Sequence, residues 1–372
     1  MRKVEVSTIT AILDTSLAVI FTWVAYKTGQ ILWKYTPYSY PNARIRAMEA
    51  RLFTEQKFNE LAESKTLNNF IMNLEDSDYK PYLTSLPVLN SESIDRALDR
   101  ALADTYELFY RILPKRSREF FKLLLEEWDV RNITSSVKAK LRGEVARDYI
   151  SEIGTMVEKV KAIADAKSLE EILVILEGTE YEEPYQKLLL KEITPEEFET
   201  ELYKNHYLKL SKYAATRKDE EKKILQEFVK LKIDKINLST ILRGKAHGLG
   251  ADKLRDSLIP GGKVKRKTLE ALANMEDVEM VLAELDSTEY SGIIREHREE
   301  ILEDISAFEK AFDRYILQRM AELTRFYPLS IAVPLNYILQ KESEIRKLKA
   351  VTKLIEDGAK PEIIKRVVGE LP

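Results

Sequence analysis

The sequence contains no cysteine among its 372 residues. Disulfides and thiolate metal ligands are therefore excluded, and a reducing compartment is the natural environment for the chain. Glycine and proline are also scarce, with 12 of each. A β-sandwich or barrel needs turn residues at intervals of about 8–12 positions, so this composition predicts an all-α fold.

An excess of charge of either sign is also missing. The chain has 59 basic and 62 acidic side chains, and its formal net charge is -3. This balance offers no basic field for nucleic acid. Arg116 and Arg118 lie near Phe120 and Phe121, but we expect these aromatics to face the core and the arginines to face water. Nucleic acid is not an expected partner.

No constellation of catalytic residues is visible. A phosphate-binding loop is incomplete at Gly262-Lys263, because Ser257 replaces the first glycine and Val264 the hydroxyl residue. The three histidines lie far apart, at His206, His247 and His297. Acidic pairs such as Glu126-Glu127 occur by chance on solvated helices of so charged a chain. We expect no catalytic residue, no cofactor and no metal site, and therefore no enzyme.

One apolar run lies near the N-terminus. It extends from Leu17 to Tyr26 between Asp14 and Lys27, about half the roughly 20 residues that a spanning helix needs. The favoured interpretation is an amphipathic N-terminal helix or a start codon placed too far upstream. A role at the membrane surface stays open.

A sequence pattern recurs three times. The copies begin at Leu61, Ile163 and Leu272, at offsets of 102 and 109 residues. Each has a good helix N-cap residue, namely Thr66, Ser168 and Asp277, followed by one apolar stripe. Three similar helical domains are therefore predicted, over residues 39–145, 146–255 and 256–372, after a helical N-terminal extension over residues 1–38.

A second pattern recurs further along each copy. Polar residues at i and i+3 stand beside an apolar residue, and their leading members are Asp129 with Asn132, Asp234 with Asn237, and Glu344 with Lys347. Asparagine has no preference for helix, so its recurrence indicates a specific hydrogen bond. The favoured interpretation is a buried polar clamp made by Asp129, Asn132, Asp234, Asn237 and Glu344. Direct contact with a partner is the alternative.

Four segments resemble the C subunit of archaeal ATP synthases and the d subunit of vacuolar ATPases. They are Ser39–Met48, Asp234–Lys245, Leu258–Gly262 and Tyr337–Arg346. The likeness extends from about Ser39 to the end of the chain. Three departures are visible: Pro41 replaces the usual alanine, Lys347 replaces the usual asparagine, and the residues before Ser39 exceed what the family normally carries.

The resemblance implies three helical domains arranged as a funnel with pseudo-threefold symmetry and no catalytic residues. It implies a rotor subunit that links the central-stalk subunits to the membrane proteolipid ring and transmits torque during ATP synthesis coupled to proton or sodium transport. The chain would lie peripherally on the cytoplasmic face of the membrane. A free-standing helical repeat scaffold that binds other proteins is the alternative function.

Partner contacts are expected at two segments of the resemblance. An aromatic residue and two arginines in the first motif suit an interface anchor, and two cations stand in the second motif. The candidates are Tyr40, Arg44, Arg46, Arg243 and Lys245. For each of them, packing within its own domain is the competing interpretation.

Overall fold

The fold is that of a computed structural model, which describes the backbone of residues 2–84 and 86–372 and the side chains of residues 15–84 and 86–372. Within these ranges the chain forms helices and no β-strand, as the scarcity of turn residues predicts. The all-α fold class is therefore confirmed.

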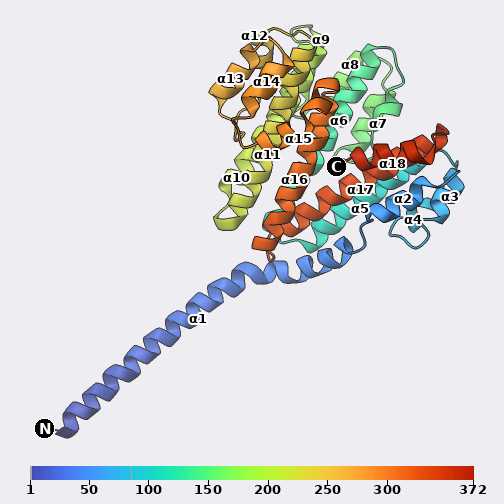
Figure 1. The fold of residues 1–372 in the computed structure, drawn as a ribbon. Helices are drawn as coiled ribbons and strands as arrows, with labels where there is room; N and C mark the ends of the chain where they lie inside the picture. Colours follow the sequence, from blue (N-terminus) through green and yellow to red (C-terminus); the bar gives the residue numbers. More distant parts are fainter. Residues whose placement is uncertain (1, 85) are drawn as a thin grey trace.

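The first helix, α1 (Arg2–Glu49), projects from the body of the molecule toward the N-terminus (Figure 1). Pro37 and Pro41 lie inside it. Proline removes a backbone donor and bends a helix, and α1 changes direction where it reaches the body (Figure 1). Beyond this bend Tyr38, Asn42 and Ile45 are buried, so only the last turns of α1 belong to the core.

The body consists of short helices interspersed with long ones. The first group is α2 (Glu55–Ala62), α3 (Leu67–Met72), α4 (Lys80–Leu83), α5 (Ser91–Ile112) and α6 (Lys115–Leu141). The second is η1 (Ala146–Tyr149), α7 (Val157–Asp165), α8 (Leu169–Leu176), α9 (Glu182–Leu189), α10 (Pro195–Thr216) and α11 (Asp219–Ala246). The third is α12 (Ala251–Asp256), α13 (Arg266–Asn274), α14 (Val278–Leu285), α15 (Ser291–Glu303), α16 (Ser306–Phe326), α17 (Ala332–Glu356) and α18 (Pro361–Glu370).

The same capping hydrogen bond starts one short helix in each group. The side chains of Thr66, Ser168 and Asp277 accept a hydrogen bond from the backbone N–H three residues further on, at the start of α3, α8 and α14. An N-cap acceptor satisfies a backbone donor that the first turn leaves free. The recurring sequence pattern therefore corresponds to a recurring local structure.

A recurring turn follows each of these helices. The hydroxyls of Ser77, Thr179 and Thr288 each donate to the carbonyl three residues earlier and accept from the backbone N–H two residues later. The residue that donates this N–H is a buried tyrosine in every copy, at positions Tyr79, Tyr181 and Tyr290. The hydroxyl residue thus turns the chain so that the tyrosine enters the core.

Three long helices organise the packing. Along α6 lie α7 and α10, and along α11 lie α13, α14 and α16. The third long helix, α17, packs on α2, α3 and α5, which come from the beginning of the chain. The predicted boundary at 145 falls in the turn after α6 and that at 255 falls inside α12.

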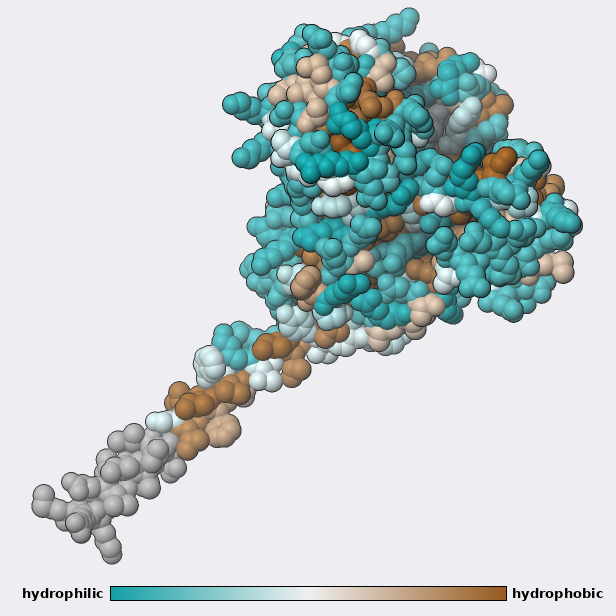
Figure 2. Space-filling view, viewed as in Figure 1, coloured by the Kyte–Doolittle hydropathy of each residue, from teal (hydrophilic) through white to brown (hydrophobic). Residues whose placement is uncertain are grey.

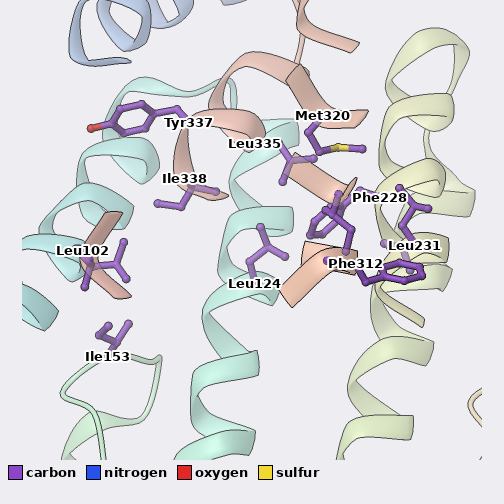
Figure 3. Close-up of a cluster of buried hydrophobic side chains, with 14 of the residues drawn as sticks. Leu102, Leu124, Ile153, Phe228, Leu231, Phe312, Met320, Leu335, Tyr337 and Ile338 are labelled. Carbon is purple, nitrogen blue, oxygen red and sulfur yellow. The ribbon is translucent and has the colours of Figure 1, made fainter. Parts of the chain in front are cut away.

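Side chains from all three long helices meet in the main apolar core. Leu124 of α6, Phe228 of α11, and Leu335 and Ile338 of α17 belong to one buried cluster (Figure 3). Phe120 and Phe121 also lie in it, as expected from the sequence, while of the two nearby arginines Arg116 is exposed and Arg118 is half-buried. Burial of these large side chains stabilises the arrangement of the long helices, since each contributes about 1.5–3 kcal/mol.

Candidate functional site

Helix α6 buries an aspartate that holds the loop following the helix. The Asp129 carboxylate accepts hydrogen bonds from the backbone N–H of Thr155 at 2.9 Å and of Met156 at 3.0 Å, and from the Thr155 hydroxyl at 2.6 Å. Asp129 is fully buried. Burial raises its pKa, although the hydrogen bonds from Thr155 and Met156 oppose this effect.

Helix α11 repeats the arrangement. The Asp234 carboxylate accepts from the backbone N–H of Lys263 at 2.9 Å and of Val264 at 3.2 Å, and from the buried Tyr290 hydroxyl at 2.6 Å. Burial raises the pKa of Asp234, and the hydrogen bond from Tyr290 works against it. The loop containing the Pro260-Gly261-Gly262 break is therefore held to α11 rather than free.

The asparagines one turn further along hold the same loops. The Asn132 amide donates to the carbonyls of Ser151 and Ile153 at 2.9 and 3.0 Å and accepts from the Ser151 N–H. The Asn237 amide donates to the Ile259 carbonyl and accepts from the Ile259 N–H, both at 2.8 Å. An amide bonded on both edges fixes the loop in register, since each bond is directional.

The third copy uses a longer side chain. Glu344 of α17 accepts from the Phe53 backbone N–H, from the Tyr79 hydroxyl at 2.6 Å and from the Lys341 ammonium at 2.9 Å. Lys347, at the asparagine position, instead places its ammonium 5.7 Å from the centre of the Phe58 ring. Asp129, Asp234 and Glu344 thus each bind a loop. The additional hydrogen bonds of an asparagine one turn further along are made in the first two copies, whereas Lys347 stands at that position in the third.

Glycines allow the two aspartates to approach their loops. A Cβ atom on Gly154 would lie 2.1 Å from the Asp129 carboxylate oxygen, and one on Gly262 would lie 1.9 Å from that of Asp234. In the third copy Leu52 precedes the bound N–H of Phe53. The extra methylene of Glu344 lets its carboxylate reach the loop from further away. The side chain of Leu52 therefore fits at the position that glycine occupies in the first two copies.

Between the long helices lies a charged cavity of about 490 Å³. Its lining includes charged side chains two residues before each loop-binding carboxylate, namely Glu127 on α6, Lys232 on α11 and Glu342 on α17. The sequence interpretation missed Lys232 and Glu342, and it was wrong to assign Glu127 to a solvated helix face, because the fold turns this face of α6 into the cavity. The signal that could have found them is the constant offset from the repeated polar pair, at which every copy carries a charge.

The ammonium group of one lysine, Lys232, influences the pKa values of two carboxylates that line the cavity. Lys232 lies 3.1 Å from Glu127, and these side chains are 21% and 18% exposed. Burial would raise the pKa of Glu127, but Lys232 and other nearby cations outweigh it and lower the pKa to about 2. Burial raises the pKa of Glu342, with Lys232 only partly opposing it.

Tyrosine hydroxyls satisfy the same two carboxylates. Tyr207 of α10 donates to Glu127 at 2.9 Å, and Tyr106 of α5 donates to Glu342 at 2.7 Å. Further round the cavity, Lys235 lies 2.6 Å from Asp313. Glu127 and Asp313 are thus paired with cations, and Glu127 and Glu342 are hydrogen-bonded, which lowers the cost of holding charge inside a protein.

His206 of α10 lies beside this network. It is only 3% exposed, and its Nε2 finds no hydrogen-bond partner among the described side chains and backbone. Its ring packs edge-on against Tyr207. Burial lowers the pKa of His206 to about 4, although Glu127 acts in the opposite direction. The imidazole is therefore neutral at pH 7.

The predicted contact residues fall at two separate places. Tyr40, Arg44 and Arg46 are exposed on α1, where Arg46 pairs with Glu49 at 2.7 Å. Arg243 is exposed near the end of α11, lines the cavity and pairs with Glu309 at 2.9 Å; Lys245 follows it, half-buried. The first group and the second therefore belong to different surfaces.

The described residues contain no group of three or more His, Asp or Glu side chains arranged to hold a metal ion. Nor does any helix, over the portion of the chain that the structure describes, have the length and apolar content to cross a membrane. The described residues thus form an all-α protein in which a capped short helix and a loop-binding carboxylate recur.

Comparison with known proteins identifies the family. The chain belongs to the ATP synthase (C/AC39) subunit family, whose sequence profile matches residues 41–367. It is 62% identical to the A-type ATP synthase C subunit of Thermococcus onnurineus over 98% of this chain and 99% of the relative. The C subunit of the A-type ATP synthase of Pyrococcus abyssi is 59% identical over 99% and 100%, and that of Methanocaldococcus jannaschii 35% over 89% and 86%.

These alignments correct one expectation. The residues before Ser39 were expected to exceed what the family carries, and the family profile does begin at residue 41. However, the Thermococcus and Pyrococcus relatives align over 98–99% of this chain. The segment therefore has a counterpart in them.

The close approach of Gly262 to Asp234 predicts the effect of one methyl group. We expect Gly262→Ala to lower the free energy of unfolding by about 1–3 kcal/mol, because the methyl displaces the buried carboxylate from its donors. Gly292→Ala, where a Cβ meets open space, serves as the control and should leave stability unchanged or slightly raised. Denaturant midpoints of both variants measure the difference; equal midpoints would contradict the argument.

Because Lys232 acts on both carboxylates, we expect the stability effects of substitutions at Lys232 and Glu127 to be coupled. Lys232→Met leaves Glu127 and Glu342 without their common counter-charge, and we expect a loss of about 2 kcal/mol of stability, less than for a dry site because the cavity admits solvent. Adding Glu127→Gln should recover part of this loss. Lys209→Met, which removes a more exposed cation of Glu126 and Glu180, should cost under about 1 kcal/mol. Purely additive single and double variants would refute the coupling.

The low pKa of His206 predicts a contribution to acid unfolding. Because the folded pKa is about 4 and the unfolded value about 6.5, the unfolded chain binds the extra proton between these pH values. Stability present above pH 6.5 should therefore fall as the pH drops toward 4, by about 2 kcal/mol between pH 7.5 and 4.5. His206→Phe should flatten this part of the stability profile, whereas replacing the exposed His247 by Gln should not. Parallel profiles for wild type and His206→Phe would exclude this role.

Proposed function

We propose that the chain is the non-catalytic rotor subunit that links the central stalk to the membrane proteolipid ring of an A-type ATP synthase. In this role it transmits torque during ATP synthesis coupled to proton or sodium transport, at the cytoplasmic face of the membrane. Family membership supports the assembly. The observation that carries the mechanical part is the set of buried carboxylates that tie each long helix to a loop.

These ties supply the stiffness that torque transmission requires. A connector that flexes stores rotation as deformation instead of passing it on. Asp129, Asp234 and Glu344 each take several donors in a buried setting, where the loss of one partner leaves a polar group unsatisfied. Each loop therefore follows its long helix as one body. We propose that the three units form a funnel with pseudo-threefold symmetry around the charged cavity.

The two groups of candidate contact residues lie toward opposite ends of α11. Its first residue, Asp219, pairs with Lys34 of α1, and Arg243 stands 24 positions further along. At 1.5 Å per residue the separation is about 36 Å. We assign the end at Arg243 and Lys245, beside the cavity, to the central stalk, and the end at Tyr40, Arg44 and Arg46 to the ring.

The stalk assignment predicts a directional effect of charge reversal. We expect Arg243→Glu with Lys245→Glu to weaken binding of the chain to purified central-stalk subunits at least tenfold, while capture of the proteolipid ring stays unchanged. Lys65→Glu with Lys80→Glu, two exposed cations on the edge formed by α2 to α4, is the matched control and should bind both partners normally. Surface binding kinetics with immobilised partners provide the measurement.

Two outcomes would overturn the proposal. If the wild-type chain binds neither the stalk subunits nor the ring, the rotor role fails as a whole. If the Arg243 and Lys245 variant loses the ring and keeps the stalk, the two ends are assigned in the wrong order. ATP turnover by the pure chain would refute the non-catalytic part, because the rotor role requires none from this subunit.

A further inference from the structure

Residues 17–33 of α1, here called the projecting segment, expose an unusual amount of apolar surface (Figure 2). Phe21 is 68% exposed and Trp33 is 86% exposed. No hydrogen bond or ion pair joins the projecting segment to the rest of the described chain, and its polar contacts stay within the helix, such as Lys27 over Trp23. Ten large apolar or aromatic side chains are exposed in it: Leu17, Val19, Ile20, Phe21, Trp23, Val24, Tyr26, Ile31, Leu32 and Trp33.

The apolar surface surrounds the helix. Val19, Ile20 and Phe21 are consecutive and therefore point in directions about 100° apart. Trp23 and Val24 fall between these directions, and Tyr26 and Trp33 lie on the remaining side. The amphipathic helix expected from the sequence is thus not formed here. A protein groove covers one stripe of a helix, whereas lipid covers all of it, and a helix that is apolar all round is typical of a membrane setting.

Charge and aromatic residues fit the same environment. No acidic residue occurs from Thr15 to Met48, while Lys27 and Lys34 are basic. Tryptophan and tyrosine concentrate at the boundary between lipid and water, and Trp23, Tyr26, Trp33 and Tyr35 supply four such rings. An apolar helix without acids and with aromatic flanks is complementary to a bilayer whose surface is anionic.

The end of the body next to the projecting segment adds free cations. Lys218 lines a surface hollow with Phe326, which is 75% exposed, and the other charges of this hollow are paired, Lys34 with Asp219 and Glu220 and Arg116 with Glu221. Lys115 begins α6, Lys218 directly precedes α11 and Arg325 lies in the last turn of α16, and all three are exposed and make no ion pair within the described residues. Cations close to a membrane attract anionic headgroups by about 1 kcal/mol each. This surface is independent of the projecting segment and favours the same occupant.

We propose that the projecting segment inserts into the apolar layer of a lipid bilayer and anchors the chain there, with the nearby cations on the headgroups. The projecting segment, 17 residues long, covers about 25 Å along the axis, which fits within a hydrocarbon core about 30 Å thick. Lys34, where the body begins, then lies at the headgroup level, and the long side chain of Lys27, about 10 Å deeper along the axis, extends toward the headgroups. The inference goes beyond the proposed rotor function and does not rest on it.

Flotation of the full chain with vesicles tests the insertion. We expect the wild type to float with vesicles made of equal parts of phosphatidylcholine and phosphatidylglycerol. Phe21→Glu with Val24→Glu should reduce the bound fraction at least tenfold, because each acid opposes entry into lipid. Met72→Glu with Val174→Glu introduces the same charge at exposed apolar positions on the body and should float like the wild type.

Tryptophan fluorescence provides a second readout that a folding defect would not imitate. The sequence has three tryptophans, so Trp33→Phe with Trp128→Phe leaves Trp23 alone in the projecting segment. Adding the vesicles should shift its emission to the blue, and bromine-labelled lipid should quench it. An unshifted, unquenched Trp23, or flotation that is insensitive to Phe21→Glu with Val24→Glu, would overturn the insertion.

Self-association is the competing outcome. If sedimentation without lipid shows oligomers that Phe21→Glu with Val24→Glu dissociates, and vesicles do not bind, a second copy of the chain covers the segment and the proposal is wrong. The same variant separates this inference from the rotor function. Lost flotation in the wild type with normal binding to the stalk subunits refutes the anchor alone, whereas failed binding to stalk and ring with normal flotation refutes the rotor role alone.

Discussion

The hydrogen bonds that the backbone N–H groups of a loop donate to a buried carboxylate are the constraint on which the rest of the structure depends. Asp129, Asp234 and Glu344 convert a long helix and the loop beside it into one rigid unit. A buried carboxylate without donors would be costly, so each loop is confined to the position that supplies them. The glycines at 154 and 262 follow from the same constraint, since no side chain fits between carboxylate and loop.

The long helices that carry these ties also carry the charges of the cavity. Glu127, Lys232 and Glu342 stand at the same offset before the three ties. Because the ties fix the rotation of each helix, they also fix where these charges point. Both glutamates accept a hydrogen bond from a tyrosine hydroxyl, and Lys232 pairs with Glu127 and attracts Glu342. The three positions are equivalent in the repeat but do not carry the same charge. Lys232 is positive and opposes the negative charges of Glu127 and Glu342.

The two ends of the molecule differ in the surface they offer. Near Arg243 the surface is charged and adjoins the cavity, which suits a polar protein partner. Where α1 meets the body the surface carries unpaired cations beside the exposed Phe326 and leads into the apolar projecting segment, which suits lipid. A helical body that is stiff between two such ends meets the physical requirement of a connector between a stalk and a membrane ring, since load applied at one end must reach the other without bending the loops.

The sequence alone determined the helical class, the three copies of the capped helix and the positions of the polar pairs, because these depend on local hydrogen bonds and on periodicity within a few residues. Tertiary structure decided what those residues bind. Glu344 meets Phe53 and Tyr79 across most of the chain, and α17 completes its unit with helices from the opposite end of the sequence. Such pairings depend on how distant helices pack, and so does the cavity. The apolar run near the N-terminus is visible in the sequence, but only the fold shows that the rest of the described chain does not cover it.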